Sequence, residues 1–261
     1  MTDKPISAPP APSALVTGAG RRIGRALALA LAETGWTVAI HYHRSEAEAE
    51  ETVAAIEAKG GRARAVRADL ADEDATESLI DRAAAQVGPL TLLVNNASIF
   101  ENDLWNTVTR ESWDQHMQVN LRAPFVLIQE FARRRPKGVP ANVVNLIDER
   151  VWNPTPFFVS YTVSKMGLWG LTQTLALALA PEVRVNAIGP GPTLRSVHQT
   201  PEQFRRQWAM MPLRRPVGVD EICRALRFIL DAPSMTGQMI ALDGGQHLGW
   251  AQPGGAAPVE N

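Results

Sequence analysis

The 261-residue chain has little cysteine, no long apolar run and no excess of charge of one sign. Its single cysteine, Cys223, excludes an intrachain disulfide framework and a cysteine-based zinc site. The most apolar stretch, residues 166–180, contains polar residues and is shorter than the ~20 residues that a membrane-spanning helix needs. With 26 basic and 27 acidic residues, the composition favours neither a nucleic-acid partner nor an anionic membrane surface. The five histidines show no metal-ligand spacing, so we expect no metal site. The single cysteine is compatible with a reducing compartment, so we expect a cytoplasmic protein.

The two ends of the chain differ in composition from the rest. The first 12 residues are rich in Pro, Ala and Ser, lack the apolar core of a secretory signal, and are expected to form a flexible leader. Residues 249–261 are expected to form a flexible tail. Residues 13–248 contain no linker and no repeat, which predicts one domain.

Within that domain, short apolar runs alternate with helix-length periodic segments. The predicted strands are residues 13–17, 36–42, 62–68, 90–95, 142–147, 183–188 and 239–242. The predicted helices are residues 21–34, 46–59, 72–87, 109–135, 160–180 and 220–230. Strands that are apolar on both faces and alternate with helices indicate an α/β fold with a doubly wound parallel sheet. Ligands of such folds bind at the carboxyl ends of the strands.

The first predicted strand runs into a glycine-rich turn, TGAGRRIG, which opens a helix. Glycines let the backbone approach a pyrophosphate, and the helix N-terminus supplies free N–H groups. One more residue separates Gly20 from Gly24 than in the usual G-x-G-x-x-G pattern. Such a turn alone is also compatible with ordinary turn chemistry, but its place after the first strand of a seven-strand pattern favours a dinucleotide.

The second predicted strand ends in a basic segment that contains His43, Arg44 and Ser45. NAD-binding folds usually place an acidic residue here for the ribose 2′-hydroxyl, and none precedes Glu46. Arg44 and its neighbours suit a 2′-phosphate through charge-assisted hydrogen bonds, which predicts NADPH as coenzyme. The alternative interpretation is a solvated helix cap, with Ser45 capping and Arg44 exposed.

Tyr161 and Lys165 lie four residues apart, on one face of a predicted helix. A tyrosine has a pKa near ~10 and is a poor acid–base group at neutral pH, whereas an ammonium group one turn away favours the phenolate. This spacing also fits an ordinary Tyr/Lys pair on a helix surface.

Several motifs occur together in a fixed order along the chain. They are TGAGRRIG, Asp69-Leu70, Asn95-Asn96-Ala97, Asn120, the YTVSK segment from Tyr161 to Lys165, and Gly189-Pro190-Gly191. This set resembles the short-chain dehydrogenase/reductase family over residues 13–248. The resemblance implies one Rossmann-type domain with a seven-stranded sheet in the order 3-2-1-4-5-6-7. It also implies a homotetramer packed through two long central helices.

The resemblance further implies roles for individual residues. Tyr161 would be the proton donor, Lys165 would bind the nicotinamide ribose, and Asn120 would hold a water in the proton relay. Asp69 would contact the adenine, and Asn96 would line the nicotinamide end. The coenzyme site implied in this way comprises Gly18, Gly20, Arg22, Ile23, Gly24, His43, Arg44, Ser45, Asp69, Leu70, Asn96, Ala97, Lys165, Pro190 and Gly191.

Two departures from the family pattern narrow the resemblance. Arg22 stands where the family's turn has a glycine, and Asp148 stands 13 residues before Tyr161, where the family has a serine. These features are similar to those of the pteridine reductases and dihydromonapterin reductases, which also carry a segment like HYHRS. That subgroup implies Ser98 and Phe100 at the substrate, with Phe100 stacked on a pterin. The implied substrate site comprises Arg22, Ser98, Phe100, Asp148 and Tyr161, with catalytic roles for Asp148, Tyr161, Lys165 and Asn120.

The chemistry of Asp148 agrees with this resemblance. Ketone reduction builds negative charge on oxygen, which a serine hydroxyl stabilises and an ionised aspartate repels. A pterin offers C=N bonds and N–H donors instead, and a carboxyl group beside Tyr161 can pass a proton to a ring nitrogen. The prediction is an NADPH-dependent reductase of a pterin of the dihydromonapterin, dihydrobiopterin or dihydrofolate type.

Two other functions stay open at this point. One is a short-chain reductase of a carbonyl substrate, such as a 3-oxoacyl thioester. The other is an inactive nucleotide-binding regulatory protein. The presence of Tyr161, Lys165 and Asn120 argues against it.

Other parts of the chain receive simpler interpretations. Glu149 and Arg150 are interpreted as solvated loop charges. Residues 189–210 are predicted to form the substrate loop, with residues 190–208 as a mobile lid.

Overall fold

The computed structural model describes residues 11–196 and 199–249. The expected flexible leader (residues 1–12) and tail (residues 249–261) therefore lie outside the described residues, apart from residues 11, 12 and 249.

The described residues form a single seven-stranded parallel sheet in the order β3-β2-β1-β4-β5-β6-β7. The strands are β1 (Ser13–Val16), β2 (Thr37–Tyr42), β3 (Arg62–Arg67), β4 (Leu90–Asn95), β5 (Ala141–Leu146), β6 (Val183–Pro190) and β7 (Met239–Leu242). The strand order reverses between β1 and β4, so the crevice at the carboxyl ends of these two strands is the expected place for a ligand. The predicted strands and their order are confirmed.

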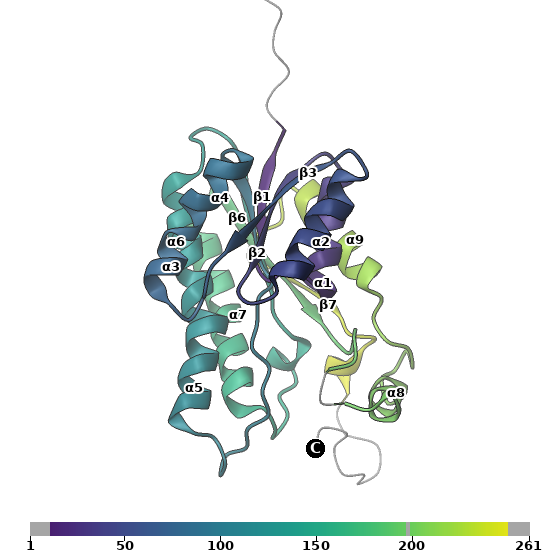
Figure 1. Cartoon of the computed structure of the whole chain (residues 1–261). Helices are drawn as coiled ribbons and strands as arrows, with labels where there is room; N and C mark the ends of the chain where they lie inside the picture. Colours follow the sequence, from purple (N-terminus) through teal and green to yellow (C-terminus); the bar gives the residue numbers. More distant parts are fainter. Residues whose placement is uncertain (1–10, 197–198, 250–261) are drawn as a thin grey trace, which may run out of the picture.

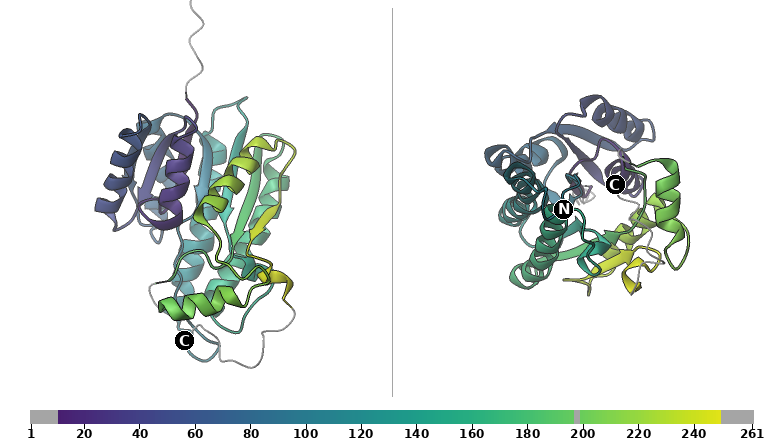
Figure 2. Two further views of the ribbon diagram at one scale, coloured as in Figure 1. Left: turned by 90° about the vertical axis from the view of Figure 1, so that its right-hand side faces the viewer. Right: turned by 90° about the horizontal axis from the view of Figure 1, so that it is seen from below.

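Helices cover both faces of this sheet (Figure 1). One face carries α1 (Arg22–Ala32), α2 (Glu46–Glu57) and α9 (Val219–Asp231). The other carries α3 (Glu73–Glu77), α4 (Leu79–Val87), α5 (Arg110–Met117), α6 (Ala123–Arg134) and α7 (Val159–Leu179). Helix α8 (Pro201–Ala209) lies apart from both layers, across the carboxyl ends of the strands (Figure 2, left).

The apolar strands explain why helices flank both faces. Along β1, Ala14 and Val16 pack into the core beneath α1 and α9, whereas Leu15 packs into the core beneath α4 and α6. In β4, Leu93 likewise points to the opposite face from Leu92 and Val94. Side chains of a strand alternate between the two faces, so a strand that is apolar at every position needs cover on both. The result is a rigid platform for the loops at its carboxyl edge.

Two predicted helices are interrupted in the structure. The helix expected at residues 72–87 is two helices, α3 and α4, which meet at Ser78. There the hydroxyl groups of Thr76 and Ser78 bond to carbonyls of the preceding turn, a pattern that bends helices. The helix expected at residues 109–135 contains a π turn at Gln118–Arg122, because Pro124 has no N–H to offer the carbonyl four residues earlier.

In the described ranges, no helix is both long and apolar enough to cross a membrane. Across the same ranges, no group of three or more His, Cys, Asp or Glu side chains is placed to hold a metal ion.

Candidate active site

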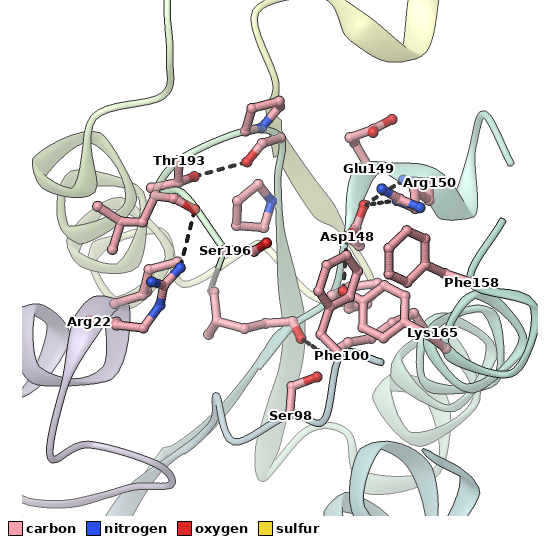
Figure 3. A pocket seen from close by; sticks show the side chains of 18 of the residues that line it. Arg22, Ser98, Phe100, Asp148, Glu149, Arg150, Phe158, Lys165, Thr193 and Ser196 are labelled. Carbon is pink, nitrogen blue, oxygen red and sulfur yellow. Dashed lines mark hydrogen bonds and ion pairs between the residues drawn. The ribbon is translucent and has the colours of Figure 1, made fainter. Parts of the chain in front are cut away.

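A cavity of about 310 Å³ opens at the carboxyl edge of the sheet (Figure 3). Its volume falls in the range of small-molecule sites. The cavity brings together ten of the residues predicted from the sequence, which are Arg22, Ile23, Asn96, Ser98, Phe100, Asp148, Tyr161, Lys165, Pro190 and Gly191. The other predicted residues do not line it: Asn120 lies behind it, and Gly18, Gly20, Gly24, His43, Arg44, Ser45, Asp69, Leu70 and Ala97 lie in the loops after β1–β4 or at the start of the helices that follow.

The glycine positions of the glycine-rich turn are tightly packed or have a backbone that favours glycine. A Cβ atom on Gly24 would lie 2.3 Å from the Gly18 carbonyl oxygen, and Gly18 itself has a left-handed backbone with φ of 63°. The buried ring of His41, which sequence reasoning passed over, accepts a hydrogen bond from Gly18 N at its Nδ1 atom, at 3.0 Å. Burial lowers the pKa of His41 to about 4, so the ring stays neutral and keeps that acceptor at physiological pH. The turn is therefore held in one shape.

The segment after β2 matches the predicted phosphate subsite in position. His43 Nε2 lies 3.3 Å from Asp69 Oδ2, which joins the loops after β2 and β3. Ser45 precedes α2 but makes no side-chain capping bond, contrary to the solvated-cap interpretation. Arg44 is exposed, and the described residues give it no ion-pair partner. A basic group and a hydroxyl group thus stand after β2, where the 2′-phosphate subsite is predicted.

Asn120 is fully buried and fixes the loop that carries Ser98. Its Oδ1 atom accepts hydrogen bonds from Ile99 N at 2.8 Å and Ser98 Oγ at 3.2 Å. Its Nδ2 group donates to Ile99 O at 2.9 Å and to Ser164 Oγ at 3.2 Å. The side chain therefore ties the β4–α5 segment to α7, and its role in holding a water stays a prediction.

Tyr161 and Lys165 lie one turn apart in α7, and both are buried. The Lys165 ammonium group donates to the Leu146 carbonyl at 2.9 Å and lies 5.7 Å from the centre of the Tyr161 ring. Burial lowers the pKa of Lys165 to about 8. Burial, together with the negative charge of Asp148, raises the pKa of Tyr161 well above its usual value of 10.0. The Tyr161 phenol therefore releases its proton less readily than an ordinary tyrosine does.

Asp148 lies directly beside Tyr161. The Tyr161 hydroxyl donates to Asp148 Oδ2 at 2.8 Å. The other carboxylate oxygen, Oδ1, accepts a hydrogen bond from Arg150 N at 3.0 Å and lies 3.8 Å from Arg150 Nε. One oxygen is thus held by the backbone, and the second faces the phenol. The carboxyl group and the phenol form one hydrogen-bonded pair on the cavity wall.

Two aromatic rings complete this wall. Phe100 stacks on Phe158 with ring centres 4.3 Å apart and planes within 6°, and it makes an edge-to-face contact with Tyr161, with ring centres 4.7 Å apart. Phe158 has a left-handed backbone with φ of 55° and directly precedes α7. Sequence reasoning missed Phe158, and no pattern around it signals either that backbone or that stacking.

The interpretation of Glu149 and Arg150 as solvated loop charges is wrong. Their exposed fractions are 3% and 5%. The Arg150 guanidinium lies over the rings of Phe158 and Phe100, at 4.9 Å and 5.7 Å from their centres. The positive charge of Arg150 lies next to the carboxyl group of Asp148 (Figure 3). This partner reduces the cost of burying the guanidinium group.

Arg22 forms the opposite side of the cavity from Asp148 and Arg150 (Figure 3). Its backbone is left-handed with φ of 55°, and its guanidinium donates to the carbonyls of Arg195 and Leu194 at 2.9 Å and 3.1 Å. In this structure Arg22 thus joins the glycine-rich turn to the segment after β6. Its predicted contacts with phosphate and pterin stay predictions.

The predicted substrate loop contains a helix that the sequence analysis did not expect. Helix α8 begins with a capping box between Thr200 and Gln203 and has Pro201 in its first turn, which are recognisable signals of a helix start. Phe204 and Gln207 of α8 line the cavity. The lid motion stays a prediction, and Val197 and His198 lie outside the described residues.

These features fit a dinucleotide coenzyme. A side chain at Gly24 would clash with the turn, and α1 begins without a side-chain cap on its N–H groups, which leaves them available to a phosphate. Asn96 Nδ2 donates to the carbonyls of Thr17 and Gly18 at 2.8 Å and 3.2 Å, so this turn and the cavity wall are one connected structure.

Comparison with known proteins bears on the family and the fold of this chain. The chain is similar to the structure of FolM alternative dihydrofolate reductase 1 from Brucella canis complexed with NADP, with 47% identity, a TM-score of 0.90, and coverage of 94% of this chain and 97% of that one. The corresponding structure from Brucella suis, in complex with NADP, also gives 47% identity and a TM-score of 0.90, over 93% and 97% of the two chains. Among curated proteins, 3-oxoacyl-(acyl-carrier-protein) reductase FabG from Staphylococcus aureus (strain Mu50) is 34% identical over 243 residues, which are 90% of this chain and 98% of that protein.

The family model for short chain dehydrogenases matches residues 12–205, which include the glycine-rich turn and the Tyr161–Lys165 pair. This match and the order of the strands in the sheet show that the chain belongs to the short-chain dehydrogenase family.

Proposed function

We propose that this protein is an NADPH-dependent reductase of a pterin, with dihydromonapterin- or dihydrobiopterin-like compounds as first candidates and dihydrofolate as the second. The observation that carries the proposal is the 2.8 Å hydrogen bond from Tyr161 to Asp148 Oδ2, beside the Phe100 ring. The similarity to proteins described as alternative dihydrofolate reductases, in complexes with NADP, supports it.

The charge of Asp148 argues against a ketone. Reduction of a carbonyl group places negative charge on an oxygen beside Tyr161, and two like unit charges ~4 Å apart repel by ~4 kcal/mol at an effective dielectric constant of ~20. A cyclic C=N group instead gains a proton on nitrogen, and the amino group and ring N–H of a pterin can donate to a carboxylate. Asp148 thus penalises one substrate class and favours the other.

The chain's own residues divide the remaining work. When bound, the coenzyme supplies the hydride. The proton that Tyr161 donates to Asp148 is the one that passes to a substrate nitrogen. The high pKa of the phenol opposes this transfer, and the positive charge of Lys165 favours it by stabilising the phenolate that remains. Lys165 keeps a positive charge near the phenol at neutral pH. Phe100 offers its ring as a stacking surface to a flat heterocycle.

Arg44, with His43 and Ser45, supports NADPH rather than NADH. The exposed guanidinium of Arg44 and the uncommitted hydroxyl group of Ser45 stand where a 2′-phosphate would add two negative charges. We further propose that the enzyme works in the cytoplasm and that it is a homotetramer. Light scattering on the purified protein will test the oligomeric state.

The second candidate is reduction of a carbonyl group in a 3-oxoacyl thioester, which the similarity to FabG favours. NADPH oxidation against a panel separates the two: 7,8-dihydromonapterin, dihydrobiopterin and dihydrofolate on one side, acetoacetyl thioesters and simple ketones on the other. We expect kcat/KM for the best pterin to exceed that for the best ketone at least ~100-fold, since a charge penalty of ~4 kcal/mol corresponds to ~10³-fold in rate. The reverse order would contradict the proposal, and no turnover of either class would favour the inactive regulatory protein.

A further inference from the structure

A buried polar cluster lies directly behind Tyr161, outside the cavity. It consists of Asp103, Ser112, His116 and Ser160, and the exposed fractions of Asp103, His116 and Ser160 are at most 3%. The four residues come from three segments: the β4–α5 segment (residues 96–109), α5 and the first turn of α7. None of them was singled out by a sequence motif.

Asp103 caps α7 from a distant part of the chain. Its Oδ1 atom accepts a hydrogen bond from Ser160 N at 3.0 Å, and its backbone carbonyl accepts one from Val159 N at 3.2 Å. Phe158, at the usual cap position, has no side chain that could do this and has a left-handed backbone. A carboxylate at a helix N-terminus satisfies free N–H groups and meets the positive end of the helix dipole. The first turn of α7 therefore depends on Asp103.

The second oxygen of Asp103 extends the cluster. Oδ2 accepts hydrogen bonds from Ser160 Oγ and from Ser112 Oγ, the latter at 2.7 Å. Burial acts to raise the pKa of Asp103, but the hydrogen bonds from Ser160 and Ser112 outweigh it and hold the pKa below its usual value. The group is therefore an ionised carboxylate that accepts hydrogen bonds at both oxygens.

His116 orders the protons of this cluster. Its Nε2 atom accepts a hydrogen bond from Glu101 N at 3.2 Å, which assigns the proton of the neutral ring to Nδ1. Nδ1 lies 2.9 Å from the Ser112 carbonyl and 2.7 Å from Ser160 Oγ. Because the carboxylate bonds to the serine and not to the histidine, the three groups are not arranged as a Ser-His-Asp nucleophile. The cluster is a connector between segments.

The connected segments carry the substrate end of the site. Phe100 belongs to the same loop as Asp103, and Phe158 and Tyr161 flank the turn that Asp103 caps. The ring of His116 packs edge-on to Tyr161, with centres 6.2 Å apart. We propose that Asp103 is a positioning residue, which fixes the Tyr161 hydroxyl and the Phe100–Phe158 pair relative to Asp148 by joining the β4–α5 segment to the start of α7. This rests on the proposed function only in taking Tyr161 as catalytic, for either substrate class.

The kinetic test compares Asp103→Ala and Asp103→Asn with a control cap variant, Asp72→Ala. Asp72 accepts a hydrogen bond from Ala75 N at 3.1 Å at the start of α3 and does not line the cavity. On whichever substrate the wild type reduces, we expect Asp103→Ala to lower kcat ~10–100-fold, since misplacement by ~1 Å can cost ~10²-fold. NADPH affinity should stay within about twofold, because Lys165 and the glycine-rich turn are untouched. Asp103→Asn should recover most of kcat, because its amide oxygen still accepts from Ser160 N.

A second readout needs no substrate or coenzyme. The chain has two tyrosines, Tyr42 and Tyr161, so protein labelled with ¹³C-tyrosine gives two resolvable ring environments. We expect the Tyr161 signal to shift or broaden in Asp103→Ala, to stay close to wild type in Asp103→Asn, and the Tyr42 signal to be unchanged in both. If Asp103→Ala does not fold, Ser160→Ala serves instead, since it keeps the backbone cap and removes one hydroxyl group, and a smaller shift is expected.

Three results would overturn the proposal. The first is an unchanged Tyr161 signal in every folded variant. The second is a lower melting temperature for Asp103→Ala combined with a wild-type kcat in the folded protein. We expect this pattern of the control Asp72→Ala, and in Asp103→Ala it would mean that Asp103 is only a structural cap. The third is an equal loss of kcat in Asp103→Asn and Asp103→Ala. Failure to reduce pterins, by contrast, would contradict the proposed function and leave the tyrosine signals to decide this inference.

Discussion

The coenzyme end and the substrate end of the cavity are built in different ways. At the coenzyme end, shape comes from backbone: Gly24 packs where no Cβ fits, Gly18 has a left-handed backbone, and α1 begins without a side-chain cap. At the substrate end, shape comes from buried side chains, with Asp148 held against Tyr161 and Arg150. The first arrangement suits any dinucleotide, whereas the second favours particular chemical groups.

This contrast separates what the family shares from what this chain adds. Backbone geometry accommodates a phosphate whatever the substrate is. We expect the buried charges beside Phe100 and Phe158 to select the substrate, because a buried charge without a partner is costly. Variants at the two ends should therefore fail differently, those at one end in coenzyme affinity and those at the other in turnover.

The largest expected effect lies at the substrate end. Tyr161→Phe removes the phenol that donates to Asp148 and should lower kcat by ~10²–10⁴, the usual cost of losing a positioned acid. NADPH affinity, measured by fluorescence titration, should stay near wild type. If turnover in the purified variant were close to normal, the proton would have to come from another group, with Asp148 the nearest.

A smaller effect, confined to the coenzyme end, is expected for Arg44→Ala. Loss of a charge-assisted hydrogen bond should weaken NADPH binding by about 1.5–3 kcal/mol and leave NADH binding little changed. Arg62→Ala is the matched control, because Arg62 is exposed at the opposite end of the sheet, where β3 begins. Equal losses for both coenzymes would contradict the assignment of the 2′-phosphate subsite.

The pH dependence of kcat/KM tests the role of Lys165, and the expected change in activity is smaller than for the two variants above. The pKa of Lys165 is lowered to about 8, and its useful form is the cation, so kcat/KM should be level below that pH and decline as pH rises through it. Asp148 acts to raise the pKa of Lys165, so Asp148→Asn should move the declining limb to lower pH. A limb that does not move, or that moves upward, would assign the titration to another group.

Sequence alone predicted the strands, turns and helices of the coenzyme end well. Its elements are local: a glycine-rich turn after a strand, a basic segment after the next, and helices that begin where expected. The strand order followed from the resemblance to the family. The break between α3 and α4 at Ser78 and the π turn before Pro124 were missed. The periodicity of apolar residues indicates which face of a helix is buried, but it does not indicate where the helix bends.

The substrate end was predicted only in part. Asp148, Tyr161 and Phe100 were found because they occupy motif positions. Arg150 was missed because its burial depends on a partner that only the tertiary structure places beside it. Phe158 was missed because a left-handed phenylalanine carries no sequence signal. Helix α8 could have been found from the capping box at Thr200.

The most direct test of the central claim is the substrate preference of Asp148→Ser, measured as the ratio of kcat/KM for a dihydropterin to that for a 3-oxoacyl thioester. The substitution removes the charge that repels an oxyanion and supplies the hydroxyl donor that suits one. If Asp148 selects for a C=N substrate, the ratio should fall at least ~100-fold, through slower pterin reduction and a gain of weak carbonyl reduction, whereas Asp148→Ala should lose the first without gaining the second. A wild type that already reduces the thioester well, ignores pterins and keeps its activity as Asp148→Ala would contradict the account.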